Sequence, residues 1–205
     1  MYRIIQKHKH RATMVEYAPA SRNVVYIERD DEGHMRDSHI LNLPFPTTIF
    51  FRSPVDPRLF VAFAKEPVKS IDDPLYCPPL PNMYNQWNMC GCDCKNLTQG
   101  IELFWQVGFN SDGGTGHTTL WKMMGESTTS EALQIWEAYS LDGFVERLVE
   151  KAEMRPFWMF ASRQLPERFN RGIPKKPEPG HLSMSGFNFE AEYPKVKSLE
   201  ALKDA

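Results

Sequence analysis

The sequence has no large excess of charge of either sign. Its 205 residues include 24 Lys and Arg against 26 Asp and Glu, a formal net charge of −2. Without a basic surplus, there is no reason to expect binding to nucleic acid or to an anionic membrane surface. No run of residues approaches the ~20 apolar positions that span a bilayer. The N-terminal residues also lack the apolar stretch of a signal peptide. We therefore expect a cytoplasmic protein.

Cysteine is scarce, and its distribution is uneven. All four cysteines lie between Cys77 and Cys94. A disulfide framework would spread its cysteines over the fold, and a chain of this length buries enough surface without one. Clustered, reduced thiols leave three interpretations: catalysis, a metal site, or no chemical role.

What the sequence does contain is enough apolar residues, 41%, for one core. Residues Met1–Arg22 are basic and weakly patterned, and we expect them to form a flexible lead-in. Three segments rich in β-branched and aromatic residues follow, at Asn23–Asp30, Thr47–Arg52 and Arg58–Lys65. Short turns and a further apolar segment separate them, which predicts an antiparallel meander.

Helices are predicted after the middle of the chain. Thr128 followed by Glu131 is a capping box, and apolar residues continue beyond it at helical spacing. A second helical stripe runs through residues 141–152, whereas Ile101–Phe109 fits either a strand or a short helix. We expect one α+β domain over residues 23–155. A C-terminal extension over 156–205 is expected to be partly ordered and then to become a polar tail.

The segment Pro67–Gly100 is rich in proline, and its apolar residues follow no regular period. A loop this long inside a compact domain is usually either functional or disordered. Its large apolar residues are of types that bury well, so we expect the loop to pack onto the core. They are Tyr76, Leu80, Met83, Tyr84, Trp87 and Met89.

Within this loop, Asn82 and Cys90 are eight positions apart. A cysteine nucleophile needs some exposure and a donor for the oxyanion that forms during acyl transfer. An Asn amide donates without first being protonated, although such a side chain also commonly organises its own loop. Cys90 is accordingly either a nucleophile or a small buried thiol.

This loop resembles the active-site segment of ubiquitin-conjugating enzymes. That family carries prolines, then a His-Pro-Asn tripeptide, with the acceptor cysteine eight residues after the Asn. Leu80-Pro81-Asn82 and Cys90 keep that spacing, after Pro78-Pro79. Over roughly residues 23–152, the sequence resembles more closely the prokaryotic, mobile-element branch of the family, of the PRTRC system protein B type.

The resemblance implies a ubiquitin-conjugating-enzyme-like fold: an antiparallel meander, a long active-site flap and packed helices. It implies a transferase in which Cys90 accepts a ubiquitin-like protein from its activating enzyme as a thioester and passes it to an amine. Asn82 would steady the oxyanion, and no cofactor is implied. Leu80 departs from the family's histidine. The run after Cys90 also departs from the family pattern, which makes Cys92 the second choice for the nucleophile.

Two other functions stay open. The first is a catalytically silent binding or assembly module of a bacterial or mobile-element system. The second is a structural protein with zinc on Cys77, Cys90, Cys92 and Cys94, although Cys-x-Cys-x-Cys spacing strains a tetrahedral site. Asp112 and His117 in the glycine-rich segment 110–117 are either an acid/base pair or part of an exposed polar loop.

Overall fold

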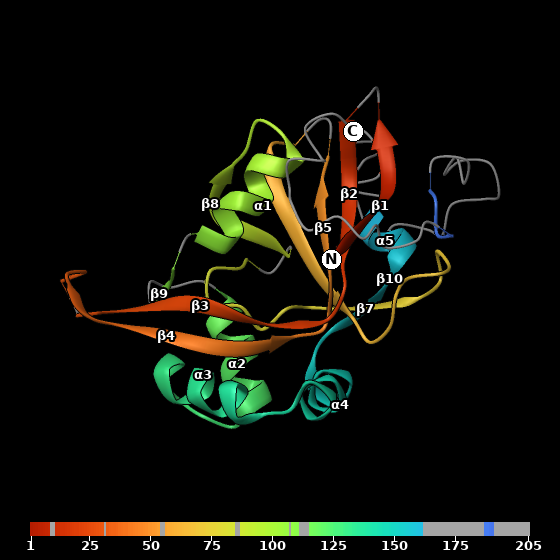
Figure 1. Cartoon of the computed structure of the whole chain (residues 1–205). Coiled ribbons are helices and arrows are strands. Elements are labelled where there is room, and N and C mark those ends of the chain that lie inside the picture. The colour runs from red at the N-terminus through yellow and green to blue at the C-terminus, as the bar shows by residue number, and fades with distance from the viewer. Residues whose placement is uncertain are drawn as a thin grey trace.

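The described strands form two β-sheets, and helices pack beside them (Figure 1). This computed structural model describes residues 1–8, 11–30, 32–53, 56–84, 87–106, 108–110, 115–161 and 187–190. Within them, the larger sheet has the order β1-β2-β5-β6-β7-β10, with β8 also paired to β6. The smaller sheet has the order β4-β3-β9. Helices and mainly antiparallel strands confirm the α+β class.

The larger sheet consists of β1 (Tyr2–His8), β2 (Arg11–Tyr17), β5 (Thr47–Arg52), β6 (Arg58–Ala64), β7 (Pro74–Tyr76), β8 (Asn88–Asp93) and β10 (Met154–Pro156). The smaller sheet consists of β3 (Ala20–Arg29), β4 (Met35–Phe45) and β9 (Phe109–Asn110). The helices are α1 (Leu97–Gln106), α2 (Thr115–Met124), α3 (Thr129–Ala138), α4 (Leu141–Lys151) and α5 (Phe157–Ala161).

The expectation of a flexible N-terminal lead-in is wrong. Strand β1 pairs with β2, and β2 pairs with β5 through partners such as Val15 and Phe50. Apolar side chains of these strands are buried, among them Ile5. The basic character of the segment is misleading, because Arg3 is itself buried and holds Glu16, with 2.7 Å between Nε and Oε1.

The expected continuous meander is also wrong, although its strands are real. Residues 20–29, 47–52 and 58–64 form β3, β5 and β6. However, β3 and β4 form a hairpin in the smaller sheet, and it is β2 that pairs with β5 on the side away from β6. Pro46, which has no N–H for a ladder bond, separates β4 from β5, and the chain changes sheet at this residue.

The two predicted helices are confirmed as α3 and α4. The Thr128 hydroxyl oxygen caps α3 by accepting from the backbone N–H of Glu131, as the capping box predicts. The ambiguous segment after Gly100 belongs largely to α1, with Phe109 in the short strand β9. Figure 1 places α2, α3 and α4 together along the β3–β4 hairpin. There the indole N–H of Trp136 donates to the Pro44 carbonyl.

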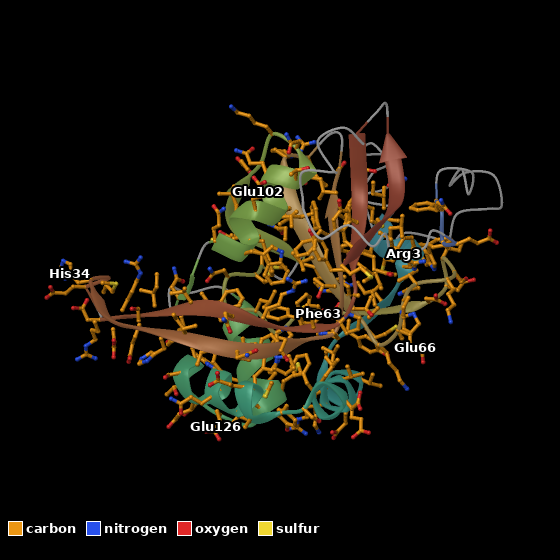
Figure 2. All side chains as sticks on the ribbon, in the orientation of Figure 1. Arg3, His34, Phe63, Glu66, Glu102 and Glu126 are labelled. Carbon is orange, nitrogen blue, oxygen red and sulfur yellow. The ribbon has the colours of Figure 1, made fainter. Side chains whose placement is uncertain are left out.

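Aromatic side chains fill the core where the two sheets meet. Phe63 on β6 lies at this centre (Figure 2) and contacts Phe45 of β4 with 5.9 Å between ring centroids. It also meets Trp136 and Phe144, which stack on each other at 4.6 Å. The smaller sheet and its helices are therefore built on the same core as the larger sheet.

Part of the expected polar tail is attached to the body of the protein. Residues Phe187–Glu190 run along the edge strand β1, where the Asn188 N–H donates to the Ile5 carbonyl at 3.0 Å. Arg3 Nη1 donates to the Phe189 carbonyl at 2.7 Å. The expected boundary at residue 155 falls inside β10, and residues 162–186 and 191–205 lie outside the described ranges. Among the helices within those ranges, none has the length and apolar character needed to span a bilayer.

Candidate thiol site

The proline-rich loop is more regular than its sequence indicates. Asn82–Tyr84 pairs with Asn88–Cys90 as a short antiparallel hairpin with Met83 opposite Met89. The Cys90 N–H donates to the Asn82 carbonyl at 2.7 Å, and the Tyr84 N–H donates to the Asn88 carbonyl at 2.9 Å. The predicted packing is confirmed for Tyr76, Leu80, Met83, Trp87 and Met89, which are buried, but Tyr84 is exposed.

The hairpin turn rests on an unusual backbone at Trp87. The Trp87 N–H donates to the Tyr84 carbonyl at 2.8 Å, and Trp87 has φ of 63°, in the left-handed region that favours glycine. Its side chain is fully buried, 6.0 Å from the Phe160 ring and under the Arg155 guanidinium at 4.8 Å. This packing holds a conformation that a bulky residue otherwise avoids.

The pairing divides the hairpin side chains between two faces. Side chains alternate along a strand, and residues directly opposite each other share a face. Met83 and Met89 therefore lie on one face and are buried. The other face carries the side chains of Asn82, Tyr84, Asn88 and Cys90, and we call it the thiol face.

An irregularity in the sheet presents Cys90 to solvent. Strand β8 pairs with β6 at Asp93–Arg58 and again at Asn88–Phe60. Between these two pairs, β6 has a single residue, Leu59, whereas β8 has four, residues 89–92. The extra residues of such a bulge leave the ladder with β6, whereas Cys90 keeps its backbone hydrogen bond to Asn82 in the hairpin. Cys90 lies within it and is exposed.

The Cys90 thiol is hydrogen-bonded to a tyrosine across the thiol face. Its Sγ lies 2.9 Å from the Tyr84 hydroxyl oxygen. The thiol donates in its neutral form, whereas the thiolate accepts from the tyrosine O–H. This hydrogen bond, together with the charge of a Cys90 thiolate, raises the pKa of Tyr84 above its usual value. The raised pKa favours the protonated Tyr84 hydroxyl, which is the form that donates to a charged sulfur.

Asn82 fastens the hairpin to another part of the chain. Its Nδ2 donates to the Gly108 carbonyl at 3.1 Å, and its Oδ1 accepts from the Asn110 N–H at 3.3 Å. The amide thus braces its loop, as one interpretation held, although its partners lie between α1 and α2. One amide hydrogen remains beyond the bond to Gly108.

The other cysteines occupy different surroundings. Cys77 and Cys94 are buried, and Cys94 Sγ donates to the Pro57 carbonyl at 3.2 Å. The side chains of Cys92 and His117 and the whole of Asp112 lie outside the described residues. The alternative nucleophile and the acid/base pair are therefore untested.

The structure describes three of the four cysteines of the zinc interpretation. Among the described side chains, no three His, Cys, Asp or Glu residues come close enough to hold a metal ion. Cys77, Cys90 and Cys94 are three of the four expected ligands, and they do not form such a group.

The sequence did not predict that two residues, Tyr84 and Asn88, lie on the thiol face. Tyr84 was expected to pack on the core, and instead its hydroxyl reaches Cys90. Asn88 is 1% exposed, and neither Oδ1 nor Nδ2 of its amide has a hydrogen-bond partner. Had the hairpin been recognised, the alternation at positions 82, 84, 88 and 90 would have placed them beside the thiol. Comparisons of the chain with family models, curated proteins and solved structures found no match.

Proposed function

We propose that this protein is a ubiquitin-conjugating-enzyme-like transferase whose acyl-carrying thiol is Cys90. The observation that carries the proposal is the placement of that thiol. It is exposed on a sheet bulge, directly across a hairpin from Asn82 and 2.9 Å from a tyrosine hydroxyl. The eight-residue spacing from Asn82 is that of the family which the loop resembles.

Exposure supports Cys90 over the other described thiols. A sulfur that takes an acyl group from one protein and gives it to another has to be reached by both. Cys77 and Cys94 are buried, so neither meets this requirement. The partners of the proposed reaction are a ubiquitin-like protein and its activating enzyme, and the proposed setting is the cytoplasm.

The chemistry is two successive acyl transfers. The Cys90 thiolate attacks the thioester carbonyl that the activating enzyme carries, and the enzyme's own thiolate leaves. An amine then attacks the Cys90 thioester, the Cys90 thiolate leaves, and the nitrogen loses a proton. Each step passes through an oxyanion that a hydrogen-bond donor stabilises. The Tyr84 hydroxyl is placed to donate to the sulfur whenever it is charged.

A catalytically silent binding or assembly module is the second candidate. The contacts of Asn82 favour it, because both ends of the amide are engaged with the backbone at Gly108 and Asn110. A residue held in this way serves the fold whether or not the thiol reacts. The two candidates differ in what the folded chain does with an activated acyl group.

The test is acyl loading and discharge with a small probe. The native chain is treated with p-nitrophenyl acetate, the acetylated cysteine is mapped by mass spectrometry, and lysine is then added as the amine. We expect acetyl on Cys90 ahead of the buried thiols, and transfer to lysine faster than from S-acetyl-N-acetylcysteine. The variant Cys77→Ala should behave like the native chain, and Cys90→Ala should not load. Discharge no faster than from the free thioester would favour the silent module.

A further inference from the structure

The least satisfied polar group near the thiol is the side chain of Asn88. It is 1% exposed, and both its Oδ1 and its Nδ2 lack a partner. Nearly all buried polar groups in folded proteins are hydrogen-bonded, so each exception calls for an explanation. Among the hairpin side chains that the structure describes, one other buried polar group, the indole N–H of Trp87, also lacks a hydrogen-bond partner.

Asn88 belongs to the thiol face by two independent relations. It lies two residues before Cys90 on β8, and alternate residues of a strand share a face. It also stands opposite Tyr84, whose N–H donates to the Asn88 carbonyl and whose hydroxyl contacts Cys90 Sγ. Positions two apart on a strand are separated by about 6.5 Å. At this separation Asn88 and Cys90 are next neighbours on the thiol face.

Asn88 and Asn82 differ in what their amides already do. The Asn82 amide bonds the backbone of Gly108 and Asn110 at its two ends. The Asn88 amide has no such engagement, and as a buried donor it is free to bind a group that forms only during reaction. Buried preorganised donors of this kind stabilise an oxyanion more strongly than solvated ones, because little reorganisation is needed.

We propose that Asn88 is the oxyanion donor for acyl groups on Cys90, while Asn82 is the residue that positions the hairpin. The inference rests on the proposed transferase function. As the thiolate or the amine attacks, the carbonyl π electrons move onto oxygen, and Asn88 Nδ2 donates to that oxygen. When the tetrahedral intermediate collapses, the electrons return, the leaving group departs and the amide hydrogen bond is released.

The test compares two reactions of the same sulfur in the full chain. Acetylation by p-nitrophenyl acetate and discharge to lysine pass through an oxyanion, whereas alkylation by iodoacetamide is a displacement at a saturated carbon. For Asn88→Ala we expect acetyl transfer into and out of Cys90 to slow about 100–1,000-fold. Alkylation of Cys90 should keep its native rate. The melting temperature should change little, because removing a buried amide that makes no hydrogen bond offsets the packing lost with the side chain.

A matched control is Asn42→Ala, the same substitution at an exposed strand position on β4 of the smaller sheet. It should leave acetyl transfer and alkylation at native rates. Native acetyl transfer in Asn88→Ala would overturn the role of Asn88 and leave the function of Cys90 standing. Parallel loss of transfer, alkylation and melting temperature would show a structural residue and would also overturn the role. If native Cys90 discharges no faster than the free thioester, the proposed function itself fails.

Discussion

Replacing Trp87 by alanine and by glycine tests how the hairpin presents its thiol. Among the described residues, Trp87 is the only non-glycine residue with positive φ, at 63°. In that region the backbone of a residue with a Cβ is destabilised by about 1–2 kcal/mol, whereas that of glycine is not. The Trp87 side chain is fully buried, and truncating such a side chain costs about 3–5 kcal/mol.

Trp87→Ala loses the side chain and keeps the backbone strain, so its free energy of unfolding should fall by about 3–5 kcal/mol. Trp87→Gly loses the same side chain but relieves the strain, and should fall by only about 2–4 kcal/mol. Glycine should therefore be the more stable variant. At ordinary positions the order is reversed, because glycine costs about 0.5–1 kcal/mol relative to alanine.

Trp136 provides the matched control, because it is also fully buried but lies inside the helix α3. There Trp136→Gly should be less stable than Trp136→Ala by about 1 kcal/mol. Urea unfolding followed by circular dichroism measures all four variants, and equal slopes would allow their stabilities to be compared. If glycine were the less stable replacement at position 87 as well, the argument that packing strains this backbone would be refuted.

Three further predictions concern the site and the tail. Asn82→Ala should lower the free energy of unfolding by about 1–3 kcal/mol, since two backbone groups lose their partner. Discharge of acetyl-Cys90 should then fall only as far as the folded fraction does; a loss of discharge in fully folded protein would give Asn82 a direct catalytic role. Cys90→Ala should move one tyrosinate absorbance transition to lower pH, because the hydrogen bond and charge that raise the pKa of Tyr84 are gone. The shift should be absent on a Tyr84→Phe background, and its presence there would contradict the assignment. Ending the chain before Phe187 should destabilise it by about 1–3 kcal/mol, because Arg3 loses a charged hydrogen bond to a carbonyl. An unchanged unfolding midpoint would show that this segment adds no stability.

Local sequence patterns were sufficient for two helices and for two strands of the larger sheet. The capping box at Thr128 and the apolar stripe over residues 141–152 predicted α3 and α4, because caps and helix faces depend on residues three or four apart. The strands at residues 47–52 and 58–64 followed from β-branched and aromatic residues in the same way. The packing of the proline-rich loop followed from its large apolar residues.

Pairing between distant segments was not predictable by this reasoning. The basic N-terminal segment becomes β1 and β2 because β5 offers an edge to pair with and Glu16 offers a buried partner for Arg3. Strand β5 lies outside residues 1–22, and so does Val68, whose N–H donates to the Glu16 carboxylate. The tail segment at Phe187 docks for the same kind of reason, since its partners are at the other end of the chain.

The same distinction between local patterns and distant contacts applies to the thiol site. The sequence by itself determined the spacing of Asn82 and Cys90 and the apolar anchors of their loop. Only the tertiary structure decided that Tyr84 contacts the sulfur, that the Asn82 amide is engaged and that Asn88 is buried without a partner. Those properties depend on strand register, on a bulge against β6 and on the chain near Gly108. Side-chain exposure and hydrogen bonding are set by neighbours that come from elsewhere in the sequence.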